Sequence, residues 1–534
     1  MKKITILLIA IIGSLQIAFA QLVTGEKIAV TNTEAGAVRG FIHNGIYTYK
    51  GIPYAEAKRF ESPQKPKPWK GVRSSLTYGP VAPLQIPTTS VQDESEFVYH
   101  HDFGYTSEDC MRVNIWTPNI NDGKKRPVLF WIHGGGFTAG SSQELPSYDG
   151  ENLAKRGDVV VVSINHRLNV LGYLDLSAYN EKYKHSANLS ILDIKAALEW
   201  VKTNITNFGG DPNNVTIYGQ SGGGAKVNTL MAMPSAKGLF HKAINESGAF
   251  RSVMKDKIFT QEVAAEVLEI LHLQPSQVDS LKSIPYQQLS DAGNQALKIV
   301  NDRASAKATG AVAAVRAGWG PSIDVIDLPY QMFSKEAFEL SKDIPLMIGT
   351  VKNEFMPSLF TNKSNATLEE VIGIIKMQQK EKADAYIAAV KKAYPNDTKP
   401  SDLMDIDVMF RPGAVRQALD KAALNAAPVY MYLFTWQSPV MDGKYKAMHC
   451  MEIPFVFYNI DRCQEMTGGS KEAIALAAKV SDAWINFART GDPNHKGLPN
   501  WPKFDAAKTP TMHFDNKCEL KPQLDKDLFD LVAH

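Results

Sequence analysis

Short runs of apolar residues bounded by turn residues recur along the chain and predict buried β-strands. Four such runs, rich in Val, Ile and aromatic residues, cover residues 113–116, 128–132, 159–164 and 215–218. Segments with apolar residues at helical spacing lie between and after them, most clearly over residues 190–204. Strands of this composition are typical of a mostly parallel sheet that helices cover on both faces. The pattern therefore predicts the α/β class with a large central sheet.

The segments on either side of these runs predict further elements. Residues 28–60 alternate apolar and polar positions between glycines, which predicts an antiparallel extension of strands and hairpins. A proline-rich stretch without periodicity follows through Tyr105 and predicts a long surface loop, of the kind that often lines a site. Helices are expected in a block over residues 260–317 and near the C-terminus over residues 473–488. Two more strands are expected at residues 344–349 and 429–435.

Length and composition are those of a globular protein with a large core. The chain has 534 residues, of which 44% are hydrophobic and 21% charged. No repeat, low-complexity tract or linker is evident, and the predicted sheet strands are scattered from about residue 113 to residue 435. We therefore expect one domain over residues 21–534 with long inserted loops and helices. The net charge of +2 gives no indication of a nucleic-acid partner or an anionic membrane surface.

The first 20 residues have the pattern of a secretory signal peptide. Two lysines precede an apolar stretch over residues 4–18, and Ala18-Phe19-Ala20 offers an A-x-A cleavage site before Gln21. The stretch is too short for a transmembrane anchor, and no later run is long enough to span a bilayer. The lysine-rich start is typical of bacteria. We expect an exported, periplasmic or secreted protein that begins near Gln21.

A nucleophile motif follows the strand predicted at residues 215–218. Gly219-Gln220-Ser221-Gly222-Gly223 reads G-x-S-x-G, and a helix-compatible pattern resumes at Ala225. A serine at a sharp strand-to-helix turn needs small neighbours so that strand and helix can pass closely. The alternative is an ordinary glycine-rich turn with a solvated serine.

A second glycine motif supports the catalytic interpretation. His133-Gly134-Gly135-Gly136 comes directly after the strand predicted at residues 128–132. A loop without side chains can turn its N–H groups toward a developing oxyanion. A flexible glycine-rich loop is the alternative, but two such motifs, in this order and each after a strand, favour chemistry.

These motifs belong to a set that resembles the type B carboxylesterase/lipase family of α/β-hydrolases, which includes bacterial p-nitrobenzyl esterase-like enzymes and the cholinesterases. The resemblance covers nearly all of the chain after the signal peptide. It implies an α/β-hydrolase fold. Further stretches that are similar to family signatures are residues 49–55, 107–118, 207–212 and 487–493.

The resemblance implies a catalytic triad of Ser221, Glu354 and His449. Glu354 lies where the family has a GTxxDE motif, and His449 lies in a segment similar to the family's H-x-x-E/D-L/I-P-F/Y-V-F. The order serine, acid, histidine is the one that α/β-hydrolases show. By the same resemblance the oxyanion donors are the N–H groups of Gly135, Gly136 and Gly222, and Ser247 lies near the triad; a buried structural serine is nearly as good an interpretation for Ser247. No metal or other cofactor is implied.

The chain departs from the family at four positions. Gln220 replaces the usual glutamate before the nucleophile, which removes a negative charge and argues against a cationic, choline-like substrate. Gly222 replaces an alanine, and Phe355 stands where glycine often follows the acid. Cys110 has no upstream cysteine, so the family's disulfide at that loop cannot form. The cysteines allow three full pairings, and Cys450 beside His449 is interpreted as structural; they are Cys110, Cys450, Cys463 and Cys518.

The resulting hypothesis is a serine carboxylic-ester hydrolase that acts on a small ester with an apolar acyl or aryl group. Phe355, Met356, Leu359 and Phe360 could form an apolar pocket wall, although core packing explains them equally well. A non-catalytic binding member of the family is one alternative. A lipase, thioesterase or amidase is another, because the triad does not distinguish leaving groups. The sequence does not indicate the natural substrate or the oligomeric state.

Overall fold

The computed structural model describes residues 22–84, 93–249, 254–307 and 318–532. The predicted signal peptide, residues 1–20, lies outside this part, as does the end of the predicted helical block at residues 308–317. Among the described residues, no helix combines the length and the apolar composition needed to cross a membrane.

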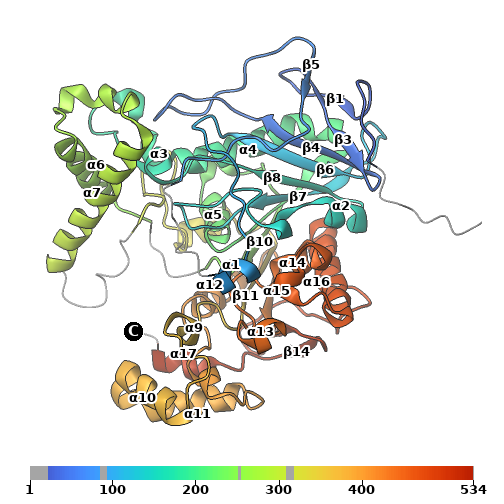
Figure 1. The fold of residues 1–534 in the computed structure, drawn as a ribbon, viewed down its shortest axis with the longest axis vertical. Coiled ribbons are helices and arrows are strands. Elements are labelled where there is room, and N and C mark those ends of the chain that lie inside the picture. Colours follow the sequence, from blue (N-terminus) through green and yellow to red (C-terminus); the bar gives the residue numbers. More distant parts are fainter. Residues whose placement is uncertain (1–21, 85–92, 250–253, 308–317, 533–534) are drawn as a thin grey trace, which may run out of the picture.

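A large twisted sheet runs through the centre of the molecule (Figure 1). In the described part of the chain it has eleven strands. Their order across the sheet is β14 (Glu519–Lys521), β13 (Thr511–Phe514), β12 (Val429–Phe434), β11 (Leu346–Val351), β10 (Lys242–Glu246), β9 (Gly210–Gln220), β7 (Arg126–Ile132), β8 (Val160–Ile164), β6 (Arg112–Thr117), β4 (Ile46–Pro53) and β3 (Phe41–His43).

The sheet is mostly parallel, as predicted. Every neighbouring pair from β13 to β8 is parallel. The remaining pairs lie toward the two edges and are antiparallel: β13 with β14, β8 with β6, β6 with β4, and β4 with β3. A small second sheet joins β1 (Val30–Asn32) and β2 (Ala37–Arg39) as an antiparallel pair and adds β5 (Val72–Ser74) in parallel. The antiparallel N-terminal extension is therefore confirmed.

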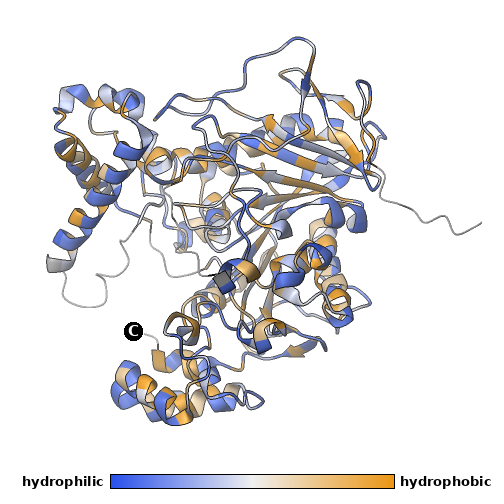
Figure 2. Ribbon diagram, in the orientation of Figure 1, coloured by the Kyte–Doolittle hydropathy of each residue, from blue (hydrophilic) through white to orange (hydrophobic). Residues whose placement is uncertain are grey.

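Helices cover both faces of the sheet. Successive residues of a strand point to opposite faces, so each buried strand supplies apolar side chains to both layers. On β7, Val128, Phe130 and Ile132 join one core cluster, whereas Leu129 and Trp131 join another. The first cluster includes residues of α4 (Leu189–Asn204), α5 (Gly222–Met231) and α12 (Arg411–Ala422). The second includes residues of α2 (Glu151–Gly157), α14 (Ile453–Val456) and α16 (Lys471–Thr490). Figure 2 shows the strands between these layers mostly in the apolar colour.

Further helices surround these layers, and some of them, such as α6 and α7, add buried side chains to the first cluster. In Figure 1, α6 and α7 stand together at one side, and α10, α11 and α17 gather at the lower end. The predicted helices at residues 190–204, 260–317 and 473–488 are confirmed where they are described, by α4, by α6 with α7, and by α16. The remaining helices of the described residues are α1 (Asp93–Val98), α3 (Asn169–Tyr173), α6 (Lys257–Ile270), α7 (Tyr286–Lys307), α8 (Lys335–Leu340), α9 (Pro357–Phe360), α10 (Leu368–Gln379), α11 (Ala383–Ala393), α13 (Val440–Gly443), α15 (Gln464–Thr467) and α17 (Lys526–Val532).

The sheet extends farther along the sequence than the predicted limits of residues 113 and 435. Its edge strands β3, β4, β13 and β14 lie outside those limits, and the central strand β10 was not predicted. β10 has the sequence Lys-Ala-Ile-Asn-Glu and is buried throughout. Polar residues interrupt its apolar pattern, so only its neighbours β9 and β11 identify it as a strand.

A buried ionic network fixes the loop that carries His449. Lys446 is 3% exposed, and its ammonium lies 2.6 Å from a carboxylate oxygen of Asp402 and 2.7 Å from one of Asp405. The Asp405 carboxylate also accepts hydrogen bonds from the Ser358 N–H and hydroxyl, at 3.0 and 2.7 Å. Because Ser358 follows Glu354 closely in the chain, Asp405 joins the two loops that bear the acid and the histidine.

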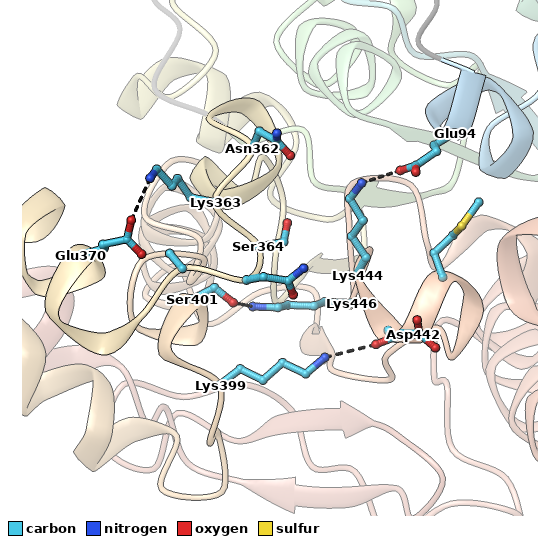
Figure 3. A pocket seen from close by; sticks show the side chains of 14 residues that line it. Glu94, Asn362, Lys363, Ser364, Glu370, Lys399, Ser401, Asp442, Lys444 and Lys446 are labelled. Carbon is cyan, nitrogen blue, oxygen red and sulfur yellow. Dashed lines mark hydrogen bonds and ion pairs between the residues drawn. The ribbon is translucent and has the colours of Figure 1, made fainter.

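A polar cavity of about 490 Å³ lies beside this network (Figure 3). The lysines that line it have partners: Lys363 pairs with Glu370, Lys444 with Glu94, and Lys399 donates to the backbone carbonyl of Asp442. Lys446 points toward Ser401, and its ammonium donates to the Ser401 hydroxyl at 3.1 Å (Figure 3). Three of the four lysines that line the cavity thus form ion pairs, and the pair of Lys444 with Glu94 joins segments far apart in the sequence.

Replacement of Lys446 by methionine is expected to lower the free energy of unfolding by about 3–5 kcal/mol, because it leaves the buried Asp405 carboxylate without its cation. The midpoint of urea unfolding measures the effect. Lys526→Met is the control, since Lys526 and its partner Asp530 are both exposed, at 69% and 65%. Equal, small shifts of the midpoint in the two variants would contradict this view of the network.

Candidate active site

The nucleophile motif forms a sharp turn between a buried strand and a helix. β9 ends at Gln220, α5 begins at Gly222, and Ser221 between them has φ 56° and ψ −124°. A Cβ on Gly223 would lie 2.0 Å from the carbonyl oxygen of Ile132, and one on Gly219 would lie 2.6 Å from the same atom. Only glycine allows this approach. The strand–turn–helix context predicted for the motif is therefore confirmed, with Ser221 half-buried at its tip.

The structure brings Glu354 and His449 into direct contact. Nδ1 of the His449 ring is hydrogen-bonded to Oε2 of the Glu354 carboxyl group. In addition, the backbone N–H of His449 donates to the backbone carbonyl of Glu354 at 3.1 Å. One residue earlier the Asn353 N–H donates to the Ala447 carbonyl at 3.0 Å. This short backbone pairing aligns the loop after β11 with the loop after β12. It explains how an acid and a histidine far apart in sequence meet.

Ser221 lies next to this pair without being bonded to it. In the described residues no hydrogen bond links the Ser221 hydroxyl to His449. The neighbouring Gln220 reaches the ring instead, with its amide nitrogen 3.2 Å from Nε2 and 3.3 Å from Nδ1. Hydrogen bonds between nucleophile and base are often long in unliganded enzymes and tighten when substrate binds.

Burial controls the charges of the acid and the base. It raises the pKa of Glu354 to about 8 and lowers the pKa of His449 to about 4, because the apolar surroundings disfavour a charge on either group alone. The Val351 N–H, which donates to Glu354 at 3.1 Å, and the nearby Ser247 hydroxyl act to lower the pKa of Glu354. The imidazole of His449 is therefore neutral when no substrate is bound. An imidazolium beside a carboxylate has no net charge and is disfavoured less than either ion.

Two aromatic rings pack against the histidine. The Phe355 ring lies 4.5 Å from the His449 ring and the Phe410 ring 5.3 Å from it, centroid to centroid. Phe410 is buried, whereas Phe355 is 45% exposed. The side chain of His449 keeps 15% of its surface exposed. The residue that replaces the family's glycine after the acid thus forms one wall beside the imidazole.

The predicted oxyanion loop lies against the start of α5. Gly135 and Gly136 have positive φ values of 77° and 61°, and a Cβ on Gly222 would lie only 2.3 Å from the Gly136 carbonyl oxygen. Among the hydrogen bonds of the described residues, none has the N–H of Gly135, Gly136 or Gly222 as its donor. The three amides therefore lie on adjoining segments and remain available to a ligand.

The sequence did not indicate Asp407, whose buried carboxylate acts on both members of the pair. Its charge tends to raise the pKa of His449, and burial together with Glu354 raises the pKa of Asp407 to about 7. The carboxylate accepts N–H bonds from Met409, Phe410 and Arg411 at the start of α12. A carboxylate that accepts N–H groups two to four residues further on forms an ordinary Asx-type turn, and only the fold places it near Glu354 and His449.

The cysteines and the other titratable groups suggest no further chemistry at this site. All four cysteines are free, buried thiols, and burial raises the pKa of Cys450 well above its usual value. The Cys450 thiol donates to the Gln220 side-chain oxygen at 3.0 Å. Ser247 is fully buried next to Glu354. The described residues contain no group of three or more His, Cys, Asp or Glu that could hold a metal ion.

Comparison with known proteins gives consistent matches along almost the whole chain. The sequence profile of the Carboxylesterase family matches residues 27–530. The para-nitrobenzyl esterase of Bacillus subtilis (strain 168) is 35% identical over 505 residues, which cover 92% of this chain and 96% of the relative. The phenmedipham hydrolase of Pseudarthrobacter oxydans is 32% identical over 490 residues, which cover 89% of this chain and 93% of the relative.

Solved structures agree with these matches. An esterase from anaerobic Clostridium hathewayi that can hydrolyze aliphatic aromatic polyesters has a TM-score of 0.84 and 37% identity, and the match covers 96% of this chain and 99% of that chain. A para-nitrobenzyl esterase structure has a TM-score of 0.75 and 33% identity, over 95% of this chain and 99% of that chain. The fold is thus the α/β-hydrolase fold, and the chain belongs to the carboxylesterase family.

Proposed function

We propose that this carboxylesterase cleaves esters through an acyl-enzyme on Ser221. The observation that carries the proposal is the Glu354–His449 contact beside a serine held on a strained turn. His449 takes the Ser221 proton as the hydroxyl oxygen attacks the ester carbonyl, and the Glu354 carboxylate offsets the charge of the imidazolium. His449 then protonates the departing alcohol. Water repeats both steps and releases the acid.

The tetrahedral intermediate carries its negative charge on the former carbonyl oxygen. The N–H groups of Gly135, Gly136 and Gly222 are the proposed donors to this oxygen. Their lack of other acceptors in the described residues supports the assignment. Loss of one such donor typically raises the barrier by about 3 kcal/mol.

We propose an ester with an apolar acyl or aryl group as substrate. Exposed apolar side chains on the two segments whose rings pack against His449 support this choice: Phe355 is 45% exposed, Phe360 74% and Met409 58%. The rings of Phe355 and Phe360 lie 6.2 Å apart. Exposed apolar clusters of this kind commonly mark binding surfaces. Two of the similar proteins, the para-nitrobenzyl esterase and the polyester-hydrolysing esterase, carry aromatic compounds in their names.

Purified protein is expected to hydrolyse p-nitrophenyl esters from acetate to octanoate, and Ser221→Ala should lower kcat by at least about 10⁴-fold, because no other group can form the acyl-enzyme. A serine-directed fluorophosphonate should label the wild type once and leave the variant unlabelled. Ser481→Ala is the matched control. This buried serine lies in α16, and its hydroxyl has no hydrogen-bond partner in the described residues.

The same measurements distinguish the alternatives. A preference for soluble short-chain esters supports a carboxylesterase. Activation by emulsified triglyceride indicates a lipase instead. Turnover of thioester or amide analogues alone indicates a thioesterase or an amidase. Full activity in Ser221→Ala would disprove the mechanism. A folded wild type that is inert on every ester and unlabelled by the fluorophosphonate would favour a binding protein.

On the acid side, kcat/KM is expected to fall with a midpoint pH well below 6.5, because 6.5 is about the pKa of an ordinary histidine. The general base works when neutral and is lost as pH falls through its pKa. Burial lowers the pKa of His449 to about 4, so the loss of activity moves to lower pH. Initial rates between pH 4 and 8, with folding monitored by circular dichroism, measure this midpoint. A midpoint at 6.5 would show that burial does not control this imidazole.

We propose that the protein is exported and begins at Gln21. The basic start, apolar stretch and A-x-A site over residues 1–20 support this proposal. When the full chain is expressed in a bacterium, intact-mass measurement of periplasmic or secreted material should give a chain without residues 1–20. Retention of these residues, or recovery in the cytoplasm alone, would refute export.

A further inference from the structure

A fully buried lysine lies behind the oxyanion loop. Lys226 is in the second turn of α5, five residues after Ser221, and is 0% exposed. Its ammonium donates to the carbonyl oxygen of His133 at 3.0 Å. His133 is the residue from which the glycines of the loop depart. Burial of an ammonium group is costly unless its interactions compensate, so a lysine at this position needs an explanation beyond packing.

The groups that face Lys226 come from the loop after β7 and the loop after β8. Glu144, in the loop after Gly136, is 6% exposed and its carboxylate favours the charged lysine. His133, after β7, and His166, after β8, stack at 4.8 Å, and burial holds the pKa of each well below its usual range. Both imidazoles are therefore neutral, and Lys226 and Glu144 are the two groups of this cluster that titrate near neutral pH.

The contact joins the two segments that carry the proposed oxyanion donors. Gly135 and Gly136 belong to the loop after β7, whereas Gly222 is the first residue of α5. Lys226 extends from that same helix to the base of the loop. Oxyanion donors act only when they lie 2.7–3.1 Å from the developing charge, so the separation of loop and helix must be held closely.

We propose that Lys226 is a positioning residue for the oxyanion hole: its ammonium, bound to the His133 carbonyl, holds the glycine loop at the correct distance from the N-terminus of α5. The inference rests on the proposed roles of Gly135, Gly136 and Gly222. This positioning acts on the transition state more than on substrate binding.

The ionisation of Lys226 gives the proposal a second consequence. Burial lowers the pKa of Lys226 to about 7, against the opposing effect of Glu144. Burial likewise raises the pKa of Glu144 to about 7. The charged lysine is present below its pKa and is lost as pH rises. The loop contact should therefore weaken on the alkaline side of neutrality.

The test compares Lys226→Met with Lys421→Met in the purified mature protein. Lys421 is a matched control in α12: it is 1% exposed and donates to the Ser341 carbonyl at 2.7 Å, and burial lowers its pKa to about 8. Lys226→Met is expected to lower kcat by about 10- to 100-fold, less than the 10²–10³-fold typical of a deleted oxyanion donor, with little change in KM. Lys421→Met should keep the wild-type kcat per active site titrated with the fluorophosphonate.

Two further measurements separate positioning from a structural role. A trifluoromethyl ketone, which forms an oxyanion on the serine, should bind Lys226→Met more weakly in proportion to the loss of kcat. Wild-type kcat should fall as pH rises through about 7, and Lys226→Met should lack this alkaline limb. If Lys226→Met does not fold, the pH dependence of kcat and of ketone affinity in the wild type tests the proposal. A decline of both kcat and ketone affinity above about pH 7 supports the proposal, and a flat profile overturns it.

The outcomes separate this inference from the proposed function. A wild type that is inert on every ester refutes the ester hydrolysis on which the inference rests. If the wild type is active, equal kcat and equal ketone affinity in Lys226→Met and the wild type overturn the role of Lys226 alone. A loss of kcat per titrated site in Lys421→Met as large as that in Lys226→Met overturns it as well.

Discussion

The close passage of β9, the start of α5 and the end of β7 determines where every other group of the site can lie. A Cβ on Gly223 would lie 2.0 Å from the Ile132 carbonyl oxygen, so a larger residue would displace strand or helix. Ser221 occupies a backbone conformation that costs about 1–3 kcal/mol for a residue other than glycine. The Ser221 N–H donates to the Glu246 carbonyl at 2.8 Å, and the parallel sheet holds the turn in place.

The order of the parallel strands converts distant stretches of sequence into neighbours. β9, β10, β11 and β12 are consecutive in the sheet, so their carboxyl ends lie along one edge. Ser221 follows β9, Ser247 follows β10, Glu354 follows β11, and His449 lies in the loops after β12. Lys446 and Asp405 then tie the last two loops together with buried charges. The order of the strands brings these residues to one edge of the sheet, and the buried ion pair of Lys446 and Asp405 then holds the last two loops in place.

Features encoded by neighbouring residues could be predicted from the sequence, and features that depend on long-range contacts could not. The turn at Ser221 follows from glycines within two positions of it, and the sheet follows from apolar runs. Lys226 was not identified, because a lysine in a helix usually lies at the surface, and its burial depends on Glu144 and His133 in another segment. Asp407 has only the pattern of an ordinary Asx-type turn until the fold places it near Glu354. β10 carries polar residues that only its central position buries.

The neutral amide at Gln220 suits the electrostatics of this interior. Glu354, Glu452 and Glu246 are buried close together: the charge of Glu354 tends to raise the pKa of Glu452, and that of Glu452 tends to raise the pKa of Glu246. A carboxylate at position 220 would add a further charge and compete with Glu354 for His449. The Gln220 amide contacts the imidazole through its nitrogen and accepts the Cys450 thiol through its oxygen, without adding a charge. An amide at position 220 can therefore contact His449 without adding a charge beside Glu354.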